Sequence, residues 1–321
     1  RYFEFDKGII ALMYHRFDEH KYPSTNIQMD IFKEQINIIE NLKINFLHPK
    51  NFNEEISKPN EVKKILLTID DGFQSFYDNA WPILKKKNIP FILFISTAYV
   101  GKNGYMNWEQ IKEIEKSGLG IIGNHSHTHK YLVDETNNQI INDLNQAIAL
   151  FEKELGHSPS YFSYPFGEYS NDFKKILINL NFNVAFGQHS GVIDGTKNYL
   201  ELPRFPINEK YGNLDRFKFI IDLLPFPYKE IYPENRYLQK SENPPKLKVV
   251  FFENQKNLKN INCFSNEGNR WRDSKIKLGE ENILTINFEE KFTTERGRIN
   301  CSLNDKNGWR WLGIQYVISE Y

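Results

Sequence analysis

A short apolar run that ends in two acids, Ile65–Gly72 (ILLTIDDG), is the stretch that decides the fold. The run has no polar alternation, which is typical of a strand that is covered on both of its faces. Asp70 and Asp71 follow it directly. In folds of parallel strands and covering helices, polar residues at the C-terminal end of a strand face the functional site. We therefore expect a buried parallel strand that delivers this acidic pair to a site.

Similar runs lie on both sides of this strand, and helical patterns separate them. The clearest helix is predicted for Asn137–Leu155, with a capping-box pair, Thr136 and Gln139, at its start and Gly156 at its end. A second helix is predicted for about Asp30–Leu42. The other predicted strands are Gly8–Met13, Phe91–Ser96, Leu119–Ile122, Tyr161–Tyr164 and Asn183–Phe186. This alternation predicts a mostly parallel α/β architecture, open or barrel-like.

The pattern changes after about Leu224. Five prolines between residues 225 and 246 cannot continue a helix and indicate a connector. Beyond it, residues 247–321 carry short alternating runs with little helical periodicity, for which a small β-sandwich is the best prediction. We thus divide the chain into a domain over residues 1–224, a connector over 225–246 and an all-β domain over 247–321.

Composition excludes several classes of function. Lys+Arg and Asp+Glu number 41 each, so no strongly basic surface points to nucleic acid as a partner. The longest apolar runs are far shorter than the ~20 residues of a transmembrane segment. Because the chain begins with Arg1 and not Met, we expect a processed or cut N-terminus, and targeting cannot be read from it. Cys263 and Cys301 are either two buried thiols or one bridge, and a bridge would imply an oxidising compartment.

A histidine cluster follows one of the predicted strands. Gly123–His129 (GNHSHTH) holds three of the chain's eight histidines. His125 and His129 stand four residues apart, so one helical turn or a tight loop can direct both imidazoles at one point, with His127 pointing elsewhere. A solvated polar loop is the alternative, but histidine is rare and strand ends are where α/β folds place their sites.

The histidines favour a metal-site interpretation of the acidic pair, Asp70 and Asp71. Adjacent carboxylates at the end of a buried strand repel each other and need a cation or hydrogen bonds. Alone, they could equally cap a helix that starts near Gln74. Together with two histidines, one aspartate completes a three-ligand set of the kind that holds a catalytic zinc, and the other can act as a base on the water.

The motifs occur in a definite order along the chain: Thr68–Gly72 (TIDDG), His125–His129 (HSHTH) and Tyr164–Gly167 (YPFG). Together they resemble the first three motifs of NodB-homology polysaccharide deacetylases, carbohydrate esterase family 4, over about Gly8–Leu224. The early Met13–Arg16 (MYHR) resembles the branch that deacetylates poly-N-acetylglucosamine. The resemblance implies an α/β fold, a distorted (β/α)7 NodB-type barrel in either its ordinary or a circularly permuted form, followed here by the small all-β sandwich domain.

The resemblance also implies a role for each matched residue. Asp71, His125 and His129 would hold a divalent metal, zinc by preference, with Co²⁺, Ni²⁺ or Mn²⁺ as alternatives. Asp70 would be the general base, and Arg204 would pair with it and keep it ionised.

The remaining roles concern the acid and the oxyanion. His15 would be the general acid, with His189 as the alternative, because the late Leu-x-His motif of the family is not evident. The YPFG motif, with a backbone N–H near Phe166, would contact substrate and the oxyanion; its members are Tyr164, Pro165, Phe166 and Gly167.

The resemblance implies a hydrolase that removes N-acetyl groups from sugar residues of a polysaccharide, in a periplasmic, cell-surface or extracellular bacterial location. Deacetylation or deformylation of a lipid-linked sugar, deacetylation of peptidoglycan, and a catalytically silent glycan-binding protein are the alternatives. The expected partner is an N-acetylated glycan, with no nucleic acid and no transmembrane segment in this chain.

Overall fold

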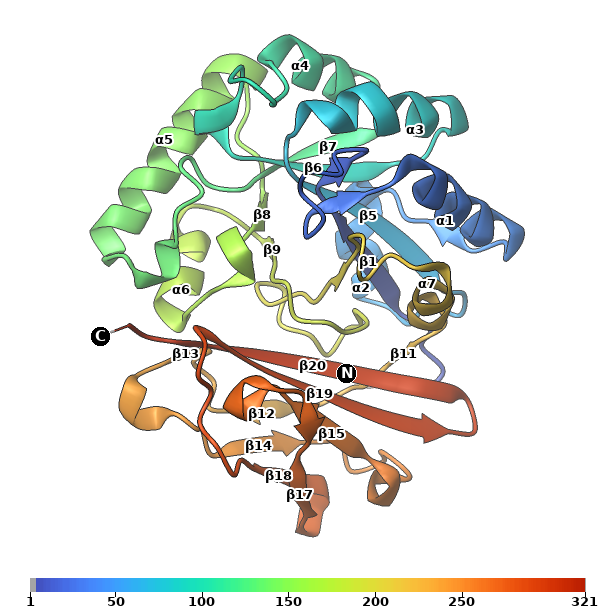
Figure 1. Ribbon diagram of the computed structural model, residues 1–321, viewed down its shortest axis with the longest axis vertical. Helices are drawn as coiled ribbons and strands as arrows, with labels where there is room; N and C mark the ends of the chain where they lie inside the picture. The colour runs from blue at the N-terminus through green and yellow to red at the C-terminus, as the bar shows by residue number, and fades with distance from the viewer. Residues whose placement is uncertain (1–3, 321) are drawn as a thin grey trace.

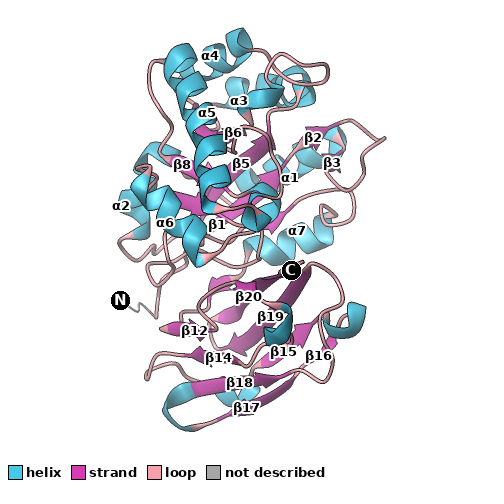
Figure 2. Cartoon of the chain, turned by 90° about the vertical axis from the view of Figure 1, so that its left-hand side faces the viewer, coloured by secondary structure: helices cyan, strands magenta, loops and turns pink. Residues whose placement is uncertain are grey.

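The computed structural model describes residues 4–320, so Arg1, where we expect processing, lies outside the described residues. Figure 1 shows two regions along the long axis of the molecule. One is a curled sheet ringed by helices, and the other is a stack of antiparallel strands. Figure 2, a view from the side, shows the same separation.

The first region is built on a curled parallel sheet, as the strand–helix alternation predicts. Its strands run in the order β10-β1-β5-β6-β7-β8-β9, with β4 paired to β5. Six strands agree with the predicted runs to within two residues: β1 (Ile9–Tyr14), β5 (Lys64–Asp71), β6 (Phe91–Ile95), β7 (Gly120–Asn124), β8 (Tyr161–Ser163) and β9 (Val184–Phe186). The two short strands β4 (Asn45–Phe46) and β10 (Phe205–Pro206) are not among the predicted runs.

One segment, residues 199–206, connects the two ends of this sheet. Its first part pairs with β9, since Ala185 N donates to the Tyr199 carbonyl (2.8 Å) and Leu202 N donates to the Ala185 carbonyl (3.0 Å). Its last part is β10, which pairs with β1 in parallel register. The sheet is therefore curled far enough for a single short segment to contact both edges.

Helices cover the outer face of the sheet (Figure 1). Helix α5 begins and ends as predicted, with the Thr136–Gln139 capping box and with Gly156 in the left-handed conformation. The helix expected near Gln74 begins there, widens into a π-helical turn at Phe76–Ala80 and continues as α3. The helices are α1 (Met29–Asn41), α2 (Phe52–Ile56), α3 (Trp81–Lys87), α4 (Trp108–Lys116), α5 (Asn137–Leu155), α6 (Asn171–Asn179) and α7 (Leu214–Ile221). Within residues 4–320, none is both long and apolar enough to span a bilayer.

Side chains point alternately to the two faces of the sheet, which separates two hydrophobic cores and sets the direction of the polar side chains. Ala11 and Leu66 pack in an inner cluster, while their neighbours Ile10 and Ile65 pack in another, against the helices. Side chains two residues apart on a strand share a face. Asp70 therefore lies on the inner side with Leu66, four residues before it.

The second region consists of two sheets around one hydrophobic core. The first sheet holds β11 (Leu224–Pro225), β13 (Tyr237–Leu238), β15 (Asn262–Ser265), β16 (Arg272–Asp273), β19 (Arg296–Asp305) and β20 (Gly308–Ile318). The second holds β12 (Glu230–Tyr232), β14 (Leu247–Val250), β17 (Lys275–Leu278) and β18 (Ile283–Asn287). The long β19–β20 hairpin lies on the side that faces the barrel region (Figures 1 and 2). We call residues 224–320 the β-region.

The proline-rich segment is more structured than the word connector suggests. Although its prolines cannot continue a helix, it supplies three short strands: β11 and β13 pair with β20, and β12 pairs with β14. Short strands of this kind tolerate proline because they need few donated hydrogen bonds. The domain limits at residues 224 and 246 stay a prediction.

The two cysteines form a disulfide. Cys263 on β15 and Cys301 on β19 are directly opposite each other in the sheet and are bonded, across a sequence separation of 38 residues. Of the two readings left open by the sequence, the bridge is the one the structure contains.

We predict that removing this bridge destabilises the β-region. Closing a loop of this length restricts the unfolded chain and typically contributes about 2–4 kcal/mol. The double substitution Cys263→Ser/Cys301→Ser should lower the unfolding temperature, and a reductant should lower that of the unchanged protein to the same value. Two titratable thiols in the unreduced, unfolded protein would contradict the prediction.

Candidate metal centre and active site

Three side chains from two strand ends converge on one point. Asp71 is the last residue of β5, and His125 and His129 lie in the loop that follows β7. Asp71 Oδ1 is 3.1 Å from His125 Nε2 and 3.3 Å from His129 Nε2. One ligand atom from each residue fits within a 4.8 Å cluster. The structure thus brings together the three residues that the sequence proposes as ligands.

The histidine loop is held in shape by hydrogen bonds to Asp143 of α5 and by one within the loop. Asp143 on α5 accepts hydrogen bonds from the backbone N–H groups of His127 and Thr128. Ser126 Oγ accepts one from His129 N at 3.0 Å. His129 has a positive φ of 54°, a conformation that non-glycine residues adopt only where the surroundings enforce it. The tight loop turns His129 back toward His125.

His127 takes no part in this cluster. Its Nδ1 lies 2.8 Å from Thr97 Oγ1, on the other side of the loop. His127 therefore fastens the loop to the segment after β6. This agrees with the prediction that His127 points away from His125 and His129.

The donor set fits a divalent cation. His125 Nδ1 lies 2.7 Å from the Ser163 carbonyl, which can only accept, so Nδ1 carries a proton and Nε2 is left to face Asp71. Burial lowers the pKa of His125, but the charges of Asp70 and Asp71 outweigh this and raise the pKa above its usual value. Asp71 Oδ1 is buried and makes no hydrogen bond. Two imidazole nitrogens around a buried carboxylate oxygen need a positive charge among them, which a proton or a divalent cation can supply. Two imidazoles and a carboxylate are the ligands that zinc and similar ions prefer.

Asp70 is clamped by Arg204 in the interior of the barrel. Arg204 Nη1 donates to Asp70 Oδ1 at 2.8 Å and Nη2 donates to Oδ2 at 2.9 Å, and both side chains are fully buried. Burial alone would raise the pKa of Asp70, but the Arg204 charge and its hydrogen bonds outweigh this and hold the pKa below its usual value. Asp70 is thus ionised, and its Oδ2 lies 3.9 Å from His125 Nε2.

Arg204 finds an acceptor for each part of its guanidinium. Its Nε donates to the Gly187 carbonyl at 2.9 Å, and its terminal nitrogens also donate to Thr68 Oγ1 and Ser163 Oγ. Buried arginine is tolerated only when its donors are satisfied in this way. The pairing with Asp70 that the resemblance implies is present.

His15 lies across the cluster from the histidine loop. Its Nε2 is 4.0 Å from Asp71 Oδ2, and its side chain is 13% exposed at the mouth of the barrel. Burial lowers the pKa of His15, while the charges of Asp71 and Asp70 act in the opposite direction. The ring is therefore placed to exchange a proton with a group bound above Asp71.

His189, the alternative acid, has a different environment. Its Nε2 lies 3.0 Å from the Glu201 carbonyl, which fixes the proton on Nε2 and points it at the protein. Its Nδ1 is buried without a hydrogen bond, and burial lowers the pKa of His189 to about 4. A neutral imidazole whose N–H is already bonded is poorly suited to protonate a leaving group.

The YPFG motif divides its residues between the core and the cleft. Tyr164 is buried, and its hydroxyl donates to the Leu200 carbonyl, so its side chain does not reach the cleft. Phe166, with a φ of 60°, lines the cleft, and its ring packs edge-on against His129 at 4.8 Å. Gly167 N donates to the Tyr164 carbonyl, and a Cβ at Gly167 would approach Gln188 to 2.5 Å. The glycine therefore permits the close turn that brings Phe166 to the metal cluster.

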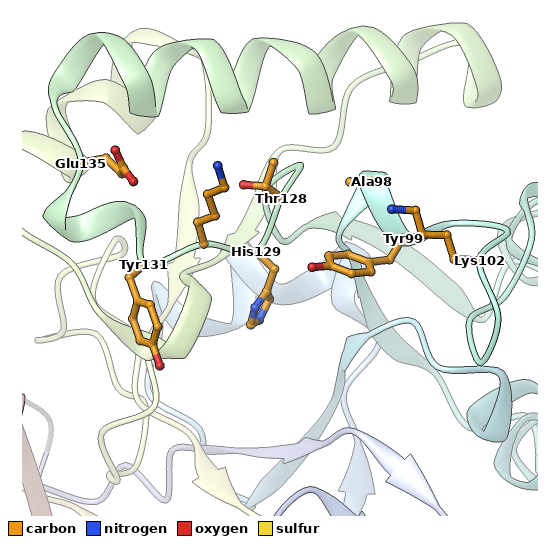
Figure 3. A pocket seen from close by; sticks show the side chains of 8 residues that line it. Ala98, Tyr99, Lys102, Thr128, His129, Tyr131 and Glu135 are labelled. Atoms are coloured by element: carbon orange, nitrogen blue, oxygen red, sulfur yellow. The ribbon is translucent and has the colours of Figure 1, made fainter.

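The cluster opens into two hollows that meet at His129. The larger, about 910 Å³, extends from His15, Asp71 and His129 to the face of the β-region. The shallower one, about 600 Å³, lies on the other side of His129. Figure 3 shows the rings of Tyr99 and Tyr131 on either side of His129 in this second hollow. Tyr131 also stacks on Phe166 at 3.9 Å.

Several residues of the site escape sequence analysis. Ser163 accepts from His125 through its carbonyl and contacts both Asp70 and Arg204 through Oγ. Asp143 organises the histidine loop from α5, the next α-helix along the chain. A lone serine or aspartate carries no spacing signal. Only its position at the end of a predicted strand could have pointed to Ser163.

Comparison with known proteins agrees with this geometry. Residues 57–185 match the family model described as polysaccharide deacetylase. A poly-β-1,6-N-acetyl-D-glucosamine N-deacetylase of Staphylococcus aureus is 26% identical over 210 residues, which cover 61% of this chain and 71% of the relative.

Solved structures resemble about two thirds of this chain. IcaB from Ammonifex degensii has a TM-score of 0.62 and 25% identity, over 67% of this chain and 97% of its own. The Streptococcus pyogenes deacetylase PplD, solved with acetate, has a TM-score of 0.61 and 22% identity over 67% of this chain and 99% of its own, and shows a shared fold. About a third of this chain thus has no counterpart in either structure. The family match over residues 57–185 and the ordered motifs lead to one conclusion: this part of the chain is similar to polysaccharide deacetylases.

Proposed function

We propose that this protein is a metal-dependent hydrolase that removes N-acetyl groups from N-acetylated sugar residues of a polysaccharide. The observation that carries the proposal is the convergence of Asp71, His125 and His129 beside an aspartate that Arg204 keeps ionised. The name of the S. aureus relative makes β-1,6-linked N-acetylglucosamine the first substrate to test.

Each residue of the site has a part in amide hydrolysis. A divalent ion bound by Asp71, His125 and His129 would supply Lewis-acid chemistry, making a water more acidic and an amide carbonyl more electrophilic. Asp70 accepts the proton of the attacking water on Oδ2, while Arg204 fixes the orientation of the carboxylate. We assign zinc as the ion, on the chemistry of the donors.

The second proton transfer falls to His15. An amide nitrogen leaves readily only once it is protonated, because its anion is a poor leaving group. His15 faces the cluster from the side opposite the histidine loop and would donate this proton, while the backbone N–H of Phe166 would bind the developing oxyanion. The products are acetate and a sugar with a free amine, which balances the water consumed.

We also infer the finer architecture and location. The contacts of residues 199–206 with both sheet edges favour a closed barrel of the (β/α)7 type, and the shared core of the two further sheets favours a β-sandwich. The disulfide favours an oxidising location such as the periplasm or cell surface.

Substitutions of the two histidine ligands and of Asp70 should separate metal binding from catalysis. His125→Ala and His129→Ala remove a ligand, so zinc content and acetate release should fall together. Asp70→Asn keeps all three ligands and should retain about one equivalent of zinc while losing roughly 100-fold or more in acetate release. Metal analysis and an acetate assay on N-acetylglucosamine oligomers measure both. Zinc loss in Asp70→Asn, with zinc kept in His125→Ala, would show that the ligand set is wrong.

The acid assignment can be tested with two matched histidine variants. His15→Gln should lower acetate release roughly 100-fold with the metal retained, because no other group would protonate the leaving amine. His189→Gln should change turnover by less than about threefold, because the ring of His189 is neutral and bonded to Glu201. The reverse ranking would transfer the role to His189.

Arg204 should set the acid side of the pH profile. In Arg204→Gln, burial remains and the positive charge is gone, so the pKa of Asp70 rises. As the pH is lowered, the variant should therefore lose activity at a higher pH than the unsubstituted protein does. The measurement is kcat/KM against pH, with zinc content and thermal unfolding checked on the same sample. An unmoved acid limb in a folded, zinc-loaded variant would contradict the assigned role of Arg204.

A further inference from the structure

The larger hollow has two walls, and the β-region forms one of them. It begins at Asp71 and His129 and runs between the barrel and the β19–β20 hairpin, with a volume of about 910 Å³. Such a volume is at the upper end of ordinary ligand pockets. The β-region contributes polar and aromatic side chains to it, chiefly Phe264, Trp271, Arg296, Arg298, Asn300 and Trp311.

Aromatic rings follow this wall from the β-region to the barrel. Trp271 packs edge-on against Phe264 at 5.7 Å, and Phe264 packs against Trp311 at the same distance. Trp311 in turn meets Phe219 of α7 at 6.2 Å. All four rings line the hollow, and Trp271 is 49% exposed. Exposed aromatic faces in a polar cleft are suited to the apolar C–H faces of sugar rings.

Polar groups stand beside the rings at positions that suit sugar substituents. Asn300 Oδ1 accepts from Ser190 Oγ at 2.7 Å, which orients the amide group of Asn300, a donor for a hydroxyl or an acetamide carbonyl. Arg298 is exposed on the same strand. A few polar groups that fix orientation among aromatic rings are the usual composition of a ligand site.

The wall is fixed to the catalytic loops. Trp311 Nε1 donates to Ser190 Oγ at 2.8 Å, and Gly191 forms a β-bridge with Leu312. Arg296 Nε donates to Glu168 Oε1 at 2.7 Å, two residues after Phe166. The β-region is thereby joined to the loops that carry His189 and Phe166, so its rings keep a constant place relative to the metal cluster.

We propose that this wall of the β-region is a subsite for sugar residues of the substrate chain beyond the residue that is deacetylated. The proposal rests on the proposed function and adds to it the class of ligand that the β-region takes, an uncharged N-acetylated oligosaccharide. The continuity of the hollow from the metal cluster to Trp271 carries this assignment.

Charge in the hollow favours acetylated neighbours over deacetylated ones. Lys210, Arg216, Arg296 and Arg298 line it, and Asp71 is the one acid among the described residues that do so. Arg216 and Arg298 have no carboxylate within 4.0 Å among residues 4–320. A protonated sugar amine would be repelled here, whereas an acetamide is uncharged. The subsite should therefore disfavour chains that are already deacetylated.

Binding of oligomers to the zinc-loaded Asp70→Asn protein tests the subsite without turnover. The probes are β-1,6-linked N-acetylglucosamine dimers and hexamers, measured by calorimetry. Trp271→Ala should lower the ratio of hexamer to dimer affinity roughly tenfold, and Trp271→Tyr should restore most of it. Trp309→Ala is the matched control, since Trp309 is 42% exposed on the same region and does not line the hollow. An unchanged ratio in a folded Trp271→Ala protein overturns the proposal.

The preference for uncharged sugars is tested with the same Asp70→Asn protein and a fully deacetylated hexamer. The deacetylated hexamer should bind more weakly than the acetylated hexamer, and Arg298→Gln should reduce this difference in affinity. Equal or tighter binding of the deacetylated hexamer overturns the stated ligand class. Acetate release by proteins that keep Asp70 separates the two proposals. If the zinc-loaded, unsubstituted protein releases no acetate from any oligomer, the proposed function is wrong. If it releases acetate and Trp271→Ala releases acetate from the hexamer equally fast, only the subsite is wrong.

Discussion

The buried pair of Arg204 and Asp70 is the contact on which the rest of the site depends. Arg204 belongs to residues 199–206, the segment that connects the two edges of the curled sheet, and its guanidinium crosses the interior to the end of β5. Burying two charges is costly unless their geometry and remaining hydrogen bonds are complete, and here Thr68, Ser163 and Gly187 complete them. The contact that fixes the closing segment is therefore the one that keeps Asp70 ionised.

Asp71 differs from its neighbour Asp70 in the partners of its carboxylate. Its φ of 80° turns the chain at the strand end, so that consecutive carboxylates point to different places. Asp70 is satisfied by protein groups, whereas Asp71 Oδ1 is buried without a hydrogen bond and faces two imidazole nitrogens. This difference in partners is the physical basis for proposing Asp70 as the proton acceptor and Asp71 as the metal ligand.

The sequence predicts most of the barrel strands, helix α5 and the convergence of Asp71, His125 and His129 well because each rests on local information. Runs such as Phe91–Ile95 are apolar throughout, and the His125–His129 spacing requires no knowledge of distant residues. What it misses depends on contacts between remote segments. The role of Ser163, the pairing of Pro225 with Trp311, and the cleft-facing side of Trp271 all arise from tertiary packing. Trp271 and Trp309 look alike in sequence, but only the first lines the hollow.

Anomalous diffraction at the zinc absorption edge, from crystals of the zinc-loaded protein, tests the central claim most directly. The account predicts one strong peak within about 2.0–2.2 Å of Nε2 of His125, Nε2 of His129 and a carboxylate oxygen of Asp71, with Asp70 still bound to Arg204. A peak coordinated by Asp70 in place of Asp71, or a fully occupied zinc elsewhere with none between these three residues, would contradict it.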